Sequence, residues 1–291
     1  MARKVDRMKR IVTVQDISCL GKCSLTVALP VISAMGVEAS VIPTAVLSTH
    51  TMFSRFTFRD LTDEIPAISD HWAEENFQFD AIYTGYLGSL RQLSLVEDLF
   101  SRFGRSGTLK IVDPVMADHG KLYAGFTPEF VKAMAKLCGK ADIILPNMTE
   151  ASFMLDVPYT ETYDRAYIEE MLKKLAGLGA KCAVLTGVSF ETGKVGFMGY
   201  DSRTGEFFEY YNERVPAAYH GTGDIFASVV TGGLARGLSL YKSLQIAADY
   251  TAQCIRVTLD DPKGVAYGVN FEEVIPSLVQ WTQDAVKEAA K

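Results

Sequence analysis

Short apolar runs rich in Val, Ile and Tyr alternate along the chain with segments in which apolar residues recur at helical spacing. Segments of the second kind, such as residues 129–139 and 167–179, end near glycine, as many helices do. Apolar strands separated by helices predict a parallel sheet covered on both faces, because such strands are buried on two sides. The pattern therefore predicts a doubly wound α/β fold. The predicted strand runs are residues 10–17, 39–48, 79–87, 109–116, 141–148 and 180–188.

Residues 193–215 break this alternation. Two runs with strand periodicity flank the turn-forming cluster Asp-Ser-Arg-Thr-Gly, which predicts an antiparallel hairpin. Three helices are predicted after it, at residues 225–237, 239–259 and 271–286. No linker, repeat or low-complexity tract interrupts the chain. We therefore expect one domain over residues 1–291, with the basic residues 1–8 as a flexible tail.

Composition excludes several classes of protein. The chain has 291 residues, 48% of them hydrophobic and 22% charged, and this is the composition of a globular domain with a sizeable core. Its formal net charge of -6 argues against a nucleic-acid partner. No apolar run is long enough to span a bilayer, and none follows the basic N-terminus as in a signal peptide, so we expect a cytoplasmic protein without membrane contact. The five scattered cysteines suggest reduced thiols, and the four histidines form no zinc-hydrolase motif.

Polar or small residues gather where the predicted strands end. The carboxyl ends of parallel strands lie along one edge of a sheet, and ligands bind in α/β proteins at that edge. The spacing therefore predicts a ligand site built from several strand ends. The clusters are Asp16 with Ser18, residues 48–51, residues 84–86, residues 113–118, residues 147–150, and Thr186 with Gly187.

A glycine turn, His-Gly-Thr-Gly-Asp at residues 220–224, precedes an apolar helix. It matches neither the P-loop nor the dinucleotide-binding fingerprint. Its glycines free the backbone amides of Gly221, Thr222 and Gly223 to bind an anion at the helix N-terminus. If phosphoryl transfer occurs here, Asp224 is placed to deprotonate the attacking hydroxyl. An acid that only stabilises the helix end explains Asp224 equally well.

Two glycines inside the same predicted helix, Gly232 and Gly233, carry a cost. Each destabilises a helix interior by about 1 kcal/mol relative to alanine. We therefore expect another backbone or a ligand to approach the helix closely at these positions.

Two further clusters have two interpretations each. Asp113 and Asp118 flank a proline turn and can hold magnesium through water, although Asp-Pro also commonly ends a strand. Asn147 or Thr149 can cap the helix that follows residue 146, with Glu150 favoured in its first turn. A role of Glu150 in metal or phosphate binding is about as well supported.

Together these segments resemble the ribokinase-like superfamily and, within it, the pyridoxal, pyridoxamine and pyridoxine kinases. The matching motifs are HGTGD, DPVMADHGKLY, LPNMTEA, TGYLGS and LSTHT, and the match covers nearly the whole chain. The glycine turn alone is typical of the superfamily, whereas its combination with LSTHT and DPVMADHGKLY is typical of the vitamin B6 branch. The resemblance implies a mostly parallel sheet flanked by helices, with a late antiparallel hairpin, and a homodimer.

The resemblance also implies an activity. It is the ATP-dependent phosphorylation of the 5′-hydroxymethyl group of a vitamin B6 vitamer, with Mg²⁺ and with a monovalent cation left open. The implied catalytic base is Asp224, with Gly221, Thr222 and Gly223 as the anion hole. Asp113, Asp118 and Glu150 would organise Mg²⁺ and the phosphates, Asn147, Glu150, Thr186 and Gly187 would lie along the nucleotide, and Asp16, Ser18, His50, Thr51 and Tyr86 would face the vitamer.

One position departs from the family. Asp16 aligns with a serine of the family, which leaves the contact to the pyridine ring unassigned, and a carboxylate there would favour a protonated ring nitrogen or an amine. Two other functions remain open. A hydroxymethylpyrimidine kinase would bind a ring of similar shape, and a non-catalytic protein would keep only the vitamer pocket, although the intact Asp224 and glycine turn argue against it.

Overall fold

The computed structural model describes residues 8–290 of the chain. Its strands are β1 Arg10–Leu20, β2 Glu38–Thr49, β3 Phe58–Asp60, β4 Ala81–Thr84, β5 Leu109–Val112, β6 Ala117–Asp118, β7 Lys121–Leu122, β8 Ile143–Ile144, β9 Cys182–Val188, β10 Lys194–Asp201 and β11 Glu206–Glu213. The main sheet has the order β11-β10-β9-β8-β5-β4-β1-β2-β3, and β6 pairs with β7 apart from it. The strands from β9 to β2 in this order are parallel, which confirms the predicted α/β class. The predicted tail, residues 1–8, lies outside the described residues except for Met8.

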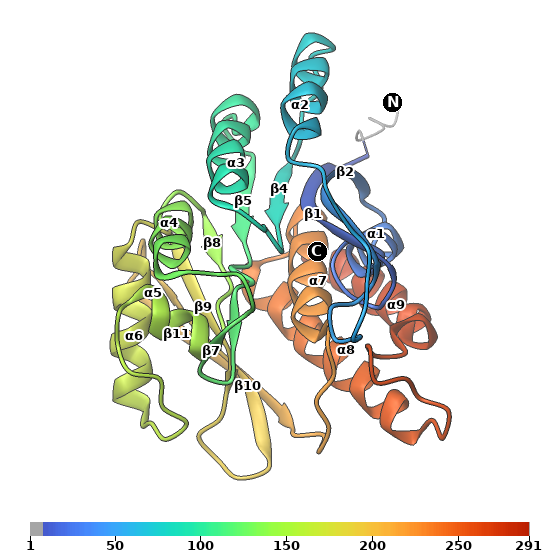
Figure 1. Cartoon of the computed structure of the whole chain (residues 1–291). Helices are drawn as coiled ribbons and strands as arrows, with labels where there is room; N and C mark the ends of the chain where they lie inside the picture. The colour runs from blue at the N-terminus through green and yellow to red at the C-terminus, as the bar shows by residue number, and fades with distance from the viewer. Residues whose placement is uncertain (1–7, 291) are drawn as a thin grey trace.

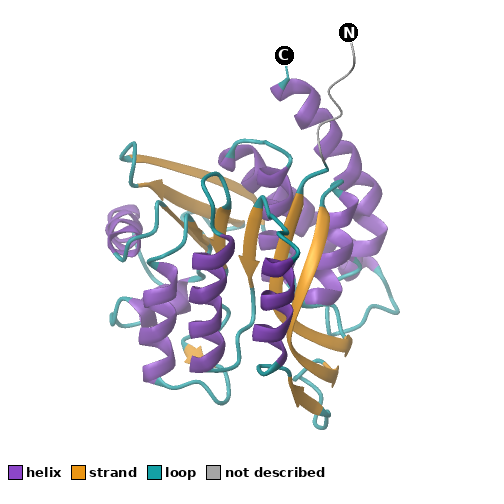
Figure 2. Ribbon diagram, turned by 90° about the horizontal axis from the view of Figure 1, so that it is seen from above, coloured by secondary structure: helices purple, strands orange, loops and turns teal. Residues whose placement is uncertain are grey.

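Helices cover both faces of the sheet (Figures 1 and 2). Alternate residues of the strands point to opposite faces, so Val12 and Val14 belong to one apolar core and Ile11 belongs to the other. The first core is closed by α2 Glu64–Glu74, α3 Leu90–Phe103, α4 Pro128–Cys138, α5 Met148–Met154 and α6 Arg165–Gly177. The second is closed by α1 Leu25–Ala34, α7 Thr222–Ala235, α8 Leu240–Asp260 and α9 Phe271–Ala289.

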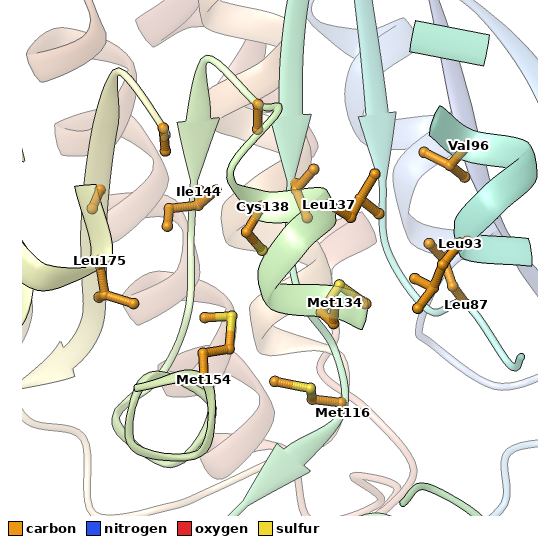
Figure 3. Packing of buried hydrophobic residues seen from close by; sticks show 14 of the residues in the cluster. Leu87, Leu93, Val96, Met116, Met134, Leu137, Cys138, Ile144, Met154 and Leu175 are labelled. Atoms are coloured by element: carbon orange, nitrogen blue, oxygen red, sulfur yellow. The ribbon is translucent and has the colours of Figure 1, made fainter. Parts of the chain in front are cut away.

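The first core fixes a loop at the carboxyl edge of the sheet. Figure 3 shows Met116, from the segment between β5 and β6, among side chains of α4, β8 and α5. Met116, Met134 and Ile144 are fully buried there. Burial of a side chain of this size stabilises its position by roughly 1.5–3 kcal/mol. The segment between Asp113 and Asp118 is therefore anchored by its own apolar residue.

The hairpin predicted late in the chain is confirmed. Strand β10 runs antiparallel to both β9 and β11, and the turn between β10 and β11 falls in the Asp-Ser-Arg-Thr-Gly cluster. Edge strands need charge or cover to avoid pairing with other chains. On β11 the carboxylate of Glu209 forms an ion pair of 2.8 Å with Arg165 of α6.

A close approach is observed at the two helix glycines, but side chains make it and not the backbone or ligand that was expected. A Cβ atom at Gly232 would lie 2.5 Å from the sulfur of Met35, and one at Gly233 would lie 2.6 Å from Oγ of Ser243 in α8. These glycines therefore let α7 pack tightly between α1 and α8. All five cysteines are free, and no helix among residues 8–290 is long and apolar enough to cross a membrane.

Candidate active site

A cavity of about 490 Å³ opens at the carboxyl edge of the sheet. This volume is in the range of pockets that bind small molecules and cofactors. Its lining comes from the segment after β5, from α5, β9, the hairpin, α7 and α8, which are distant in sequence. Among its lining are ten of the predicted site residues: Asp113, Asp118, Asn147, Glu150, Thr186, Gly187, Gly221, Thr222, Gly223 and Asp224.

The glycine turn forms the N-terminus of α7. Gly221 is the N-cap residue and adopts φ +78°, a left-handed conformation that glycine tolerates without strain. A Cβ atom at this position would lie 1.9 Å from the carbonyl oxygen of Lys22. The first amides of a helix have no partner within it, so this turn offers N–H donors to an anion in the cavity. Asp224 stands in the first turn of α7 and is not the N-cap residue.

Asp224 carries a carboxyl group that titrates near neutral pH. Burial raises its pKa to about 7, a hydrogen bond from the backbone of Ser24 opposes the rise, and the charge of Asp16 adds to it. A carboxylate with a pKa near the working pH is suited to take a proton from a hydroxyl group. The site therefore contains a candidate general base at a helix N-terminus.

Ser24 connects the two acids and was missed by the sequence analysis. It precedes α1 with φ +48°, an uncommon conformation for a residue with a side chain. Its hydroxyl hydrogen-bonds Asp16, and its backbone N–H donates to Asp224. Burial raises the pKa of Asp16, and the hydrogen bonds of Ser24 and Ser18 oppose the rise. Ser24 lies in the short segment between β1 and α1.

Asp113 faces Glu150 in the interior of the site. Their exposed fractions are 7% and 3%. Burial raises the pKa of Asp113 well above its usual range, and the charges of Glu150 and Asp224 raise it further. Glu150 is held by hydrogen bonds from the backbone N–H groups of Met116 and Asn147, at 3.1 and 2.9 Å.

Asn147 is the N-cap residue of α5. Its side chain accepts a hydrogen bond of 2.9 Å from the backbone N–H of Glu150, and Glu150 reaches back to the N–H of Asn147. This reciprocal pair is a capping box. Of the two caps predicted, Asn147 is therefore the one observed, whereas the hydroxyl of Thr149 accepts from the N–H of Gly120.

Asp118 is more exposed to solvent than Asp113, the residue predicted to act with it. Its side chain is half exposed, and its carboxylate accepts a hydrogen bond of 2.8 Å from the N–H of His119. The acid whose charge acts most on Asp113 is thus Glu150. Within residues 8–290, Asp113, Glu150 and Asp224 form no ion pair with lysine or arginine.

These carboxyl groups have no basic partner among the described residues, so a bound cation would balance their charge. Magnesium is commonly bound by one or two carboxylates together with water and substrate phosphates. Accordingly, no group of three His, Cys, Asp or Glu side chains in the described part of the chain is arranged to enclose a metal. Asp113 and Glu150 are the residues that fit Mg²⁺ best.

The residues predicted to face the vitamer lie beside this cavity and not among its lining. Ser18 donates a hydrogen bond of 3.4 Å to Asp16. The pKa of Tyr86 is raised mainly by burial and further by the charge of Asp16. The ring of His50 lies 4.5 Å from that of His220, which directly precedes the glycine turn. Burial lowers the pKa of His50, and His220 lowers it further.

One predicted residue, Thr51, remains to be located, and two residues near the site were not predicted. Thr51 stands in an exposed turn after β2. His220 was not among the predicted site residues, and its contact with His50 depends on two loops separated by 169 residues. Arg214 was also missed. It follows β11 and is the one lysine or arginine among the described residues that line the cavity.

Comparison with known proteins agrees with this geometry. The sequence profile of the phosphomethylpyrimidine kinases matches residues 27–269. A Bacteroides thetaiotaomicron VPI-5482 protein classed among these kinases is 40% identical, with a TM-score of 0.91 over 94% of this chain and 95% of that one. Its orthorhombic crystal form, solved with pyridoxal, is 40% identical over 94% and 96%, with a TM-score of 0.89. Pyridoxal kinase from Lactobacillus plantarum is 31% identical over 96% and 99%, with a TM-score of 0.87.

The matches extend over almost the whole chain. They confirm the resemblance to the pyridoxal kinases and the ribokinase-like fold class inferred from the motifs. The chain therefore belongs to the family of kinases that unites the phosphomethylpyrimidine kinases with the pyridoxal kinases.

Proposed function

We propose that the protein transfers the γ-phosphoryl group of ATP to the 5′-hydroxymethyl group of a vitamin B6 vitamer. The observation that carries this proposal is Asp224, an acid with a pKa of about 7 that stands in the glycine turn at the edge of a small-molecule cavity. The match to a protein solved with pyridoxal supports the choice of vitamer. A homodimer and a cytoplasmic location remain predictions.

The reaction needs one proton acceptor and one anion site. Asp224 takes the proton of the hydroxyl group while the hydroxyl oxygen bonds to the γ-phosphorus and the bond to the bridging oxygen of ADP breaks. The amides of Gly221, Thr222 and Gly223 hold the negative charge on the transferred group. Because these donors are fixed by the helix, they need no reorganisation during the reaction.

ATP would bind in the same cavity. There Val215 and Phe226 join α8 residues Ala248, Ala252 and Ile255 in an apolar wall suited to a purine base. Asn147, Thr186 and Gly187 also line the cavity and would contact the ribose and phosphates. Asp113 and Glu150 would hold Mg²⁺ through water, and the ion would neutralise charge on the phosphates when bound.

Arg214 gives a test of the nucleotide site. We expect Arg214→Ala to raise the KM for ATP about fivefold, equivalent to roughly 1 kcal/mol for an exposed charged contact, because it removes a cation that lines the cavity. The KM for the vitamer should change little. A matched control is Arg203→Ala in the hairpin turn, where the guanidinium pairs with Asp201 at 2.6 Å. Equal KM values for ATP in both variants would contradict this placement.

Asp16 gives a test of vitamer choice. It is buried beside Asp224, and a carboxylate there favours a cationic group on the substrate. We expect Asp16→Ser and Asp16→Asn to lower kcat/KM for pyridoxamine relative to pyridoxal by about tenfold. Competition assays with both vitamers in one mixture measure this ratio directly. An unchanged ratio in both variants would reject the hypothesis.

The function as a whole is tested by a substrate panel. ATP consumption should be measured with pyridoxal, pyridoxamine, pyridoxine and hydroxymethylpyrimidine, each with and without magnesium. We expect turnover with at least one vitamer, only when magnesium is present. The family match favours hydroxymethylpyrimidine as the second candidate substrate, and a higher kcat/KM for it would replace the vitamer. If all four compounds are inert, the substrate class is wrong.

A further inference from the structure

A group of buried polar side chains lies between the sheet and α7, and the proposed mechanism does not use it. Gln15 comes from β1, Tyr83 from β4 and Ser228 from α7, and all three are fully buried. Thr13 pairs with Tyr83 across β1 and β4, so these residues point to the same face of the sheet as Gln15. Ser228 follows Asp224 by four residues and therefore lies one turn deeper on the same side of α7.

Three oxygen atoms of this group have no hydrogen-bond partner: Oε1 of Gln15, the hydroxyl of Tyr83 and Oγ of Ser228. Nε2 of Gln15 donates to the hydroxyl of Thr13 at 2.7 Å, which leaves Oε1 as the free acceptor. Burial and then the charges of Asp113 and Asp224 raise the pKa of Tyr83, whereas the side chains of Ser228 and Gln15 lower it and therefore lie close to its hydroxyl. An unpaired buried polar group costs about 1–3 kcal/mol, so three together need an explanation.

Glycine at position 85 makes room for this arrangement. A Cβ atom on Gly85 would lie 2.6 Å from Oε1 of Gln15 and 2.7 Å from its Cδ. The amide of Gln15 thus lies directly over the backbone at the end of β4. On the neighbouring strand the backbone N–H of Asp113 bonds to the carbonyl of Thr84 at 3.0 Å. These buried polar side chains therefore lie next to the candidate site, where the charges of Asp113 and Asp224 act on Tyr83.

We infer that a buried water molecule is bound by Gln15, Tyr83 and Ser228, and that it makes Tyr83 and Ser228 positioning residues for Asp224. Such a water accepts hydrogen bonds from the two hydroxyls and donates one to Oε1 of Gln15. Three hydrogen bonds are the usual number for an ordered buried water. The water joins β1 and β4 to the first two turns of α7, and it thereby restrains the direction in which Asp224 meets the substrate hydroxyl.

Crystallography and kinetics test this inference separately. A high-resolution crystal structure should show a density peak within hydrogen-bond distance of all three oxygens, and Tyr83→Phe should remove it. Tyr83→Phe and Ser228→Ala should each lower kcat about tenfold, with KM for ATP and vitamer changed less than about twofold. The double variant should lose no more kcat than the more impaired of the two single variants, because both substitutions remove the same water. Thr231→Val is the control on α7, since its hydroxyl already bonds the carbonyl of Ala227 at 2.8 Å.

Two results would overturn the inference. One is the absence of a density peak among the three oxygens. The other is a double variant whose loss of kcat is the product of the two single losses, as independent packing defects would give. The positioning role rests on the proposed function, but the density does not. A protein inert toward every substrate would therefore reject the function while the water site was still decided by the crystal structure.

Discussion

Replacement of Asp224 by asparagine should reduce kcat about a thousandfold and leave the fold intact. General-base catalysis contributes about 10²- to 10⁴-fold, and Asp224 is the acid whose pKa and position suit it to take the proton. Asparagine keeps the shape of the side chain and an oxygen that can accept the hydrogen bond from Ser24. Steady-state turnover of the preferred vitamer at saturating ATP measures the loss.

The same pKa predicts the pH dependence of the wild-type enzyme. Because Asp224 must be deprotonated to act as a base and its pKa is raised to about 7, kcat should rise as pH increases through 7 and then level off. The residual rate of Asp224→Asn should lack this rise. A variant with unchanged kcat, or a wild-type rate that falls as pH rises through 7, would contradict the assignment of the base.

Thermal stability separates loss of the base from loss of the fold. A carboxyl group whose pKa is higher in the folded than in the unfolded protein destabilises the fold as pH rises from about 4 through 7. At pH 8, Asp224→Asn should therefore be more stable than the wild type by roughly 1–2 kcal/mol, after allowance for the water that reaches this half-buried group. The exposed Asp98→Asn in α3 is the control and should change neither kcat nor stability.

Much of the fold was predictable because its signals are local. The apolar runs and the hairpin turn depend on residues within about ten positions of each other, and all of them correspond to strands of the sheet. Strand lengths were less predictable. The run at residues 141–148 contributes only the two-residue strand β8, because Pro146 lacks an amide hydrogen and Asn147 already caps α5. Leu145 is nevertheless buried, so a run of apolar residues does not mark where a strand ends.

The location of the site was predictable, whereas its internal pairing was not. Topology brings the ends of parallel strands to one edge, so polar residues after each strand converge there. Sequence proximity suggested Asp118 as the partner of Asp113, yet the side chain of Asp118 is half exposed and Glu150 is the acid whose charge acts most on Asp113. Ser24 contacts Asp224 from a distant part of the chain, so the local pattern around Ser24 does not reveal this contact. Such contacts follow from packing, which a local pattern does not contain.

Substitution of alanine at Gly221 should damage both stability and catalysis. The new methyl group would lie 1.9 Å from the carbonyl oxygen of Lys22, an atom of the backbone that cannot rotate away. The strand-to-helix segment that carries Lys22 also carries Ser24, whose N–H holds Asp224. Relief of the clash therefore moves the anion-binding amides and the base together. We expect kcat/KM to fall about 10²- to 10³-fold, as when an oxyanion-hole donor is removed.

Gly205 in the hairpin turn provides the matched control. It has φ +75°, close to the φ +78° of Gly221, but a Cβ atom there would meet no other atom within 4 Å. Gly205→Ala isolates the conformational strain, which costs about 1 kcal/mol. Urea denaturation should show Gly221→Ala to be less stable than Gly205→Ala by roughly 1–3 kcal/mol, the usual cost of overpacking. If the two variants were equally stable and equally active, contact with Lys22 would not be what holds the glycine turn in place. Since that contact joins the turn to the loop that positions Asp224, its loss should lower catalysis even where the protein remains folded.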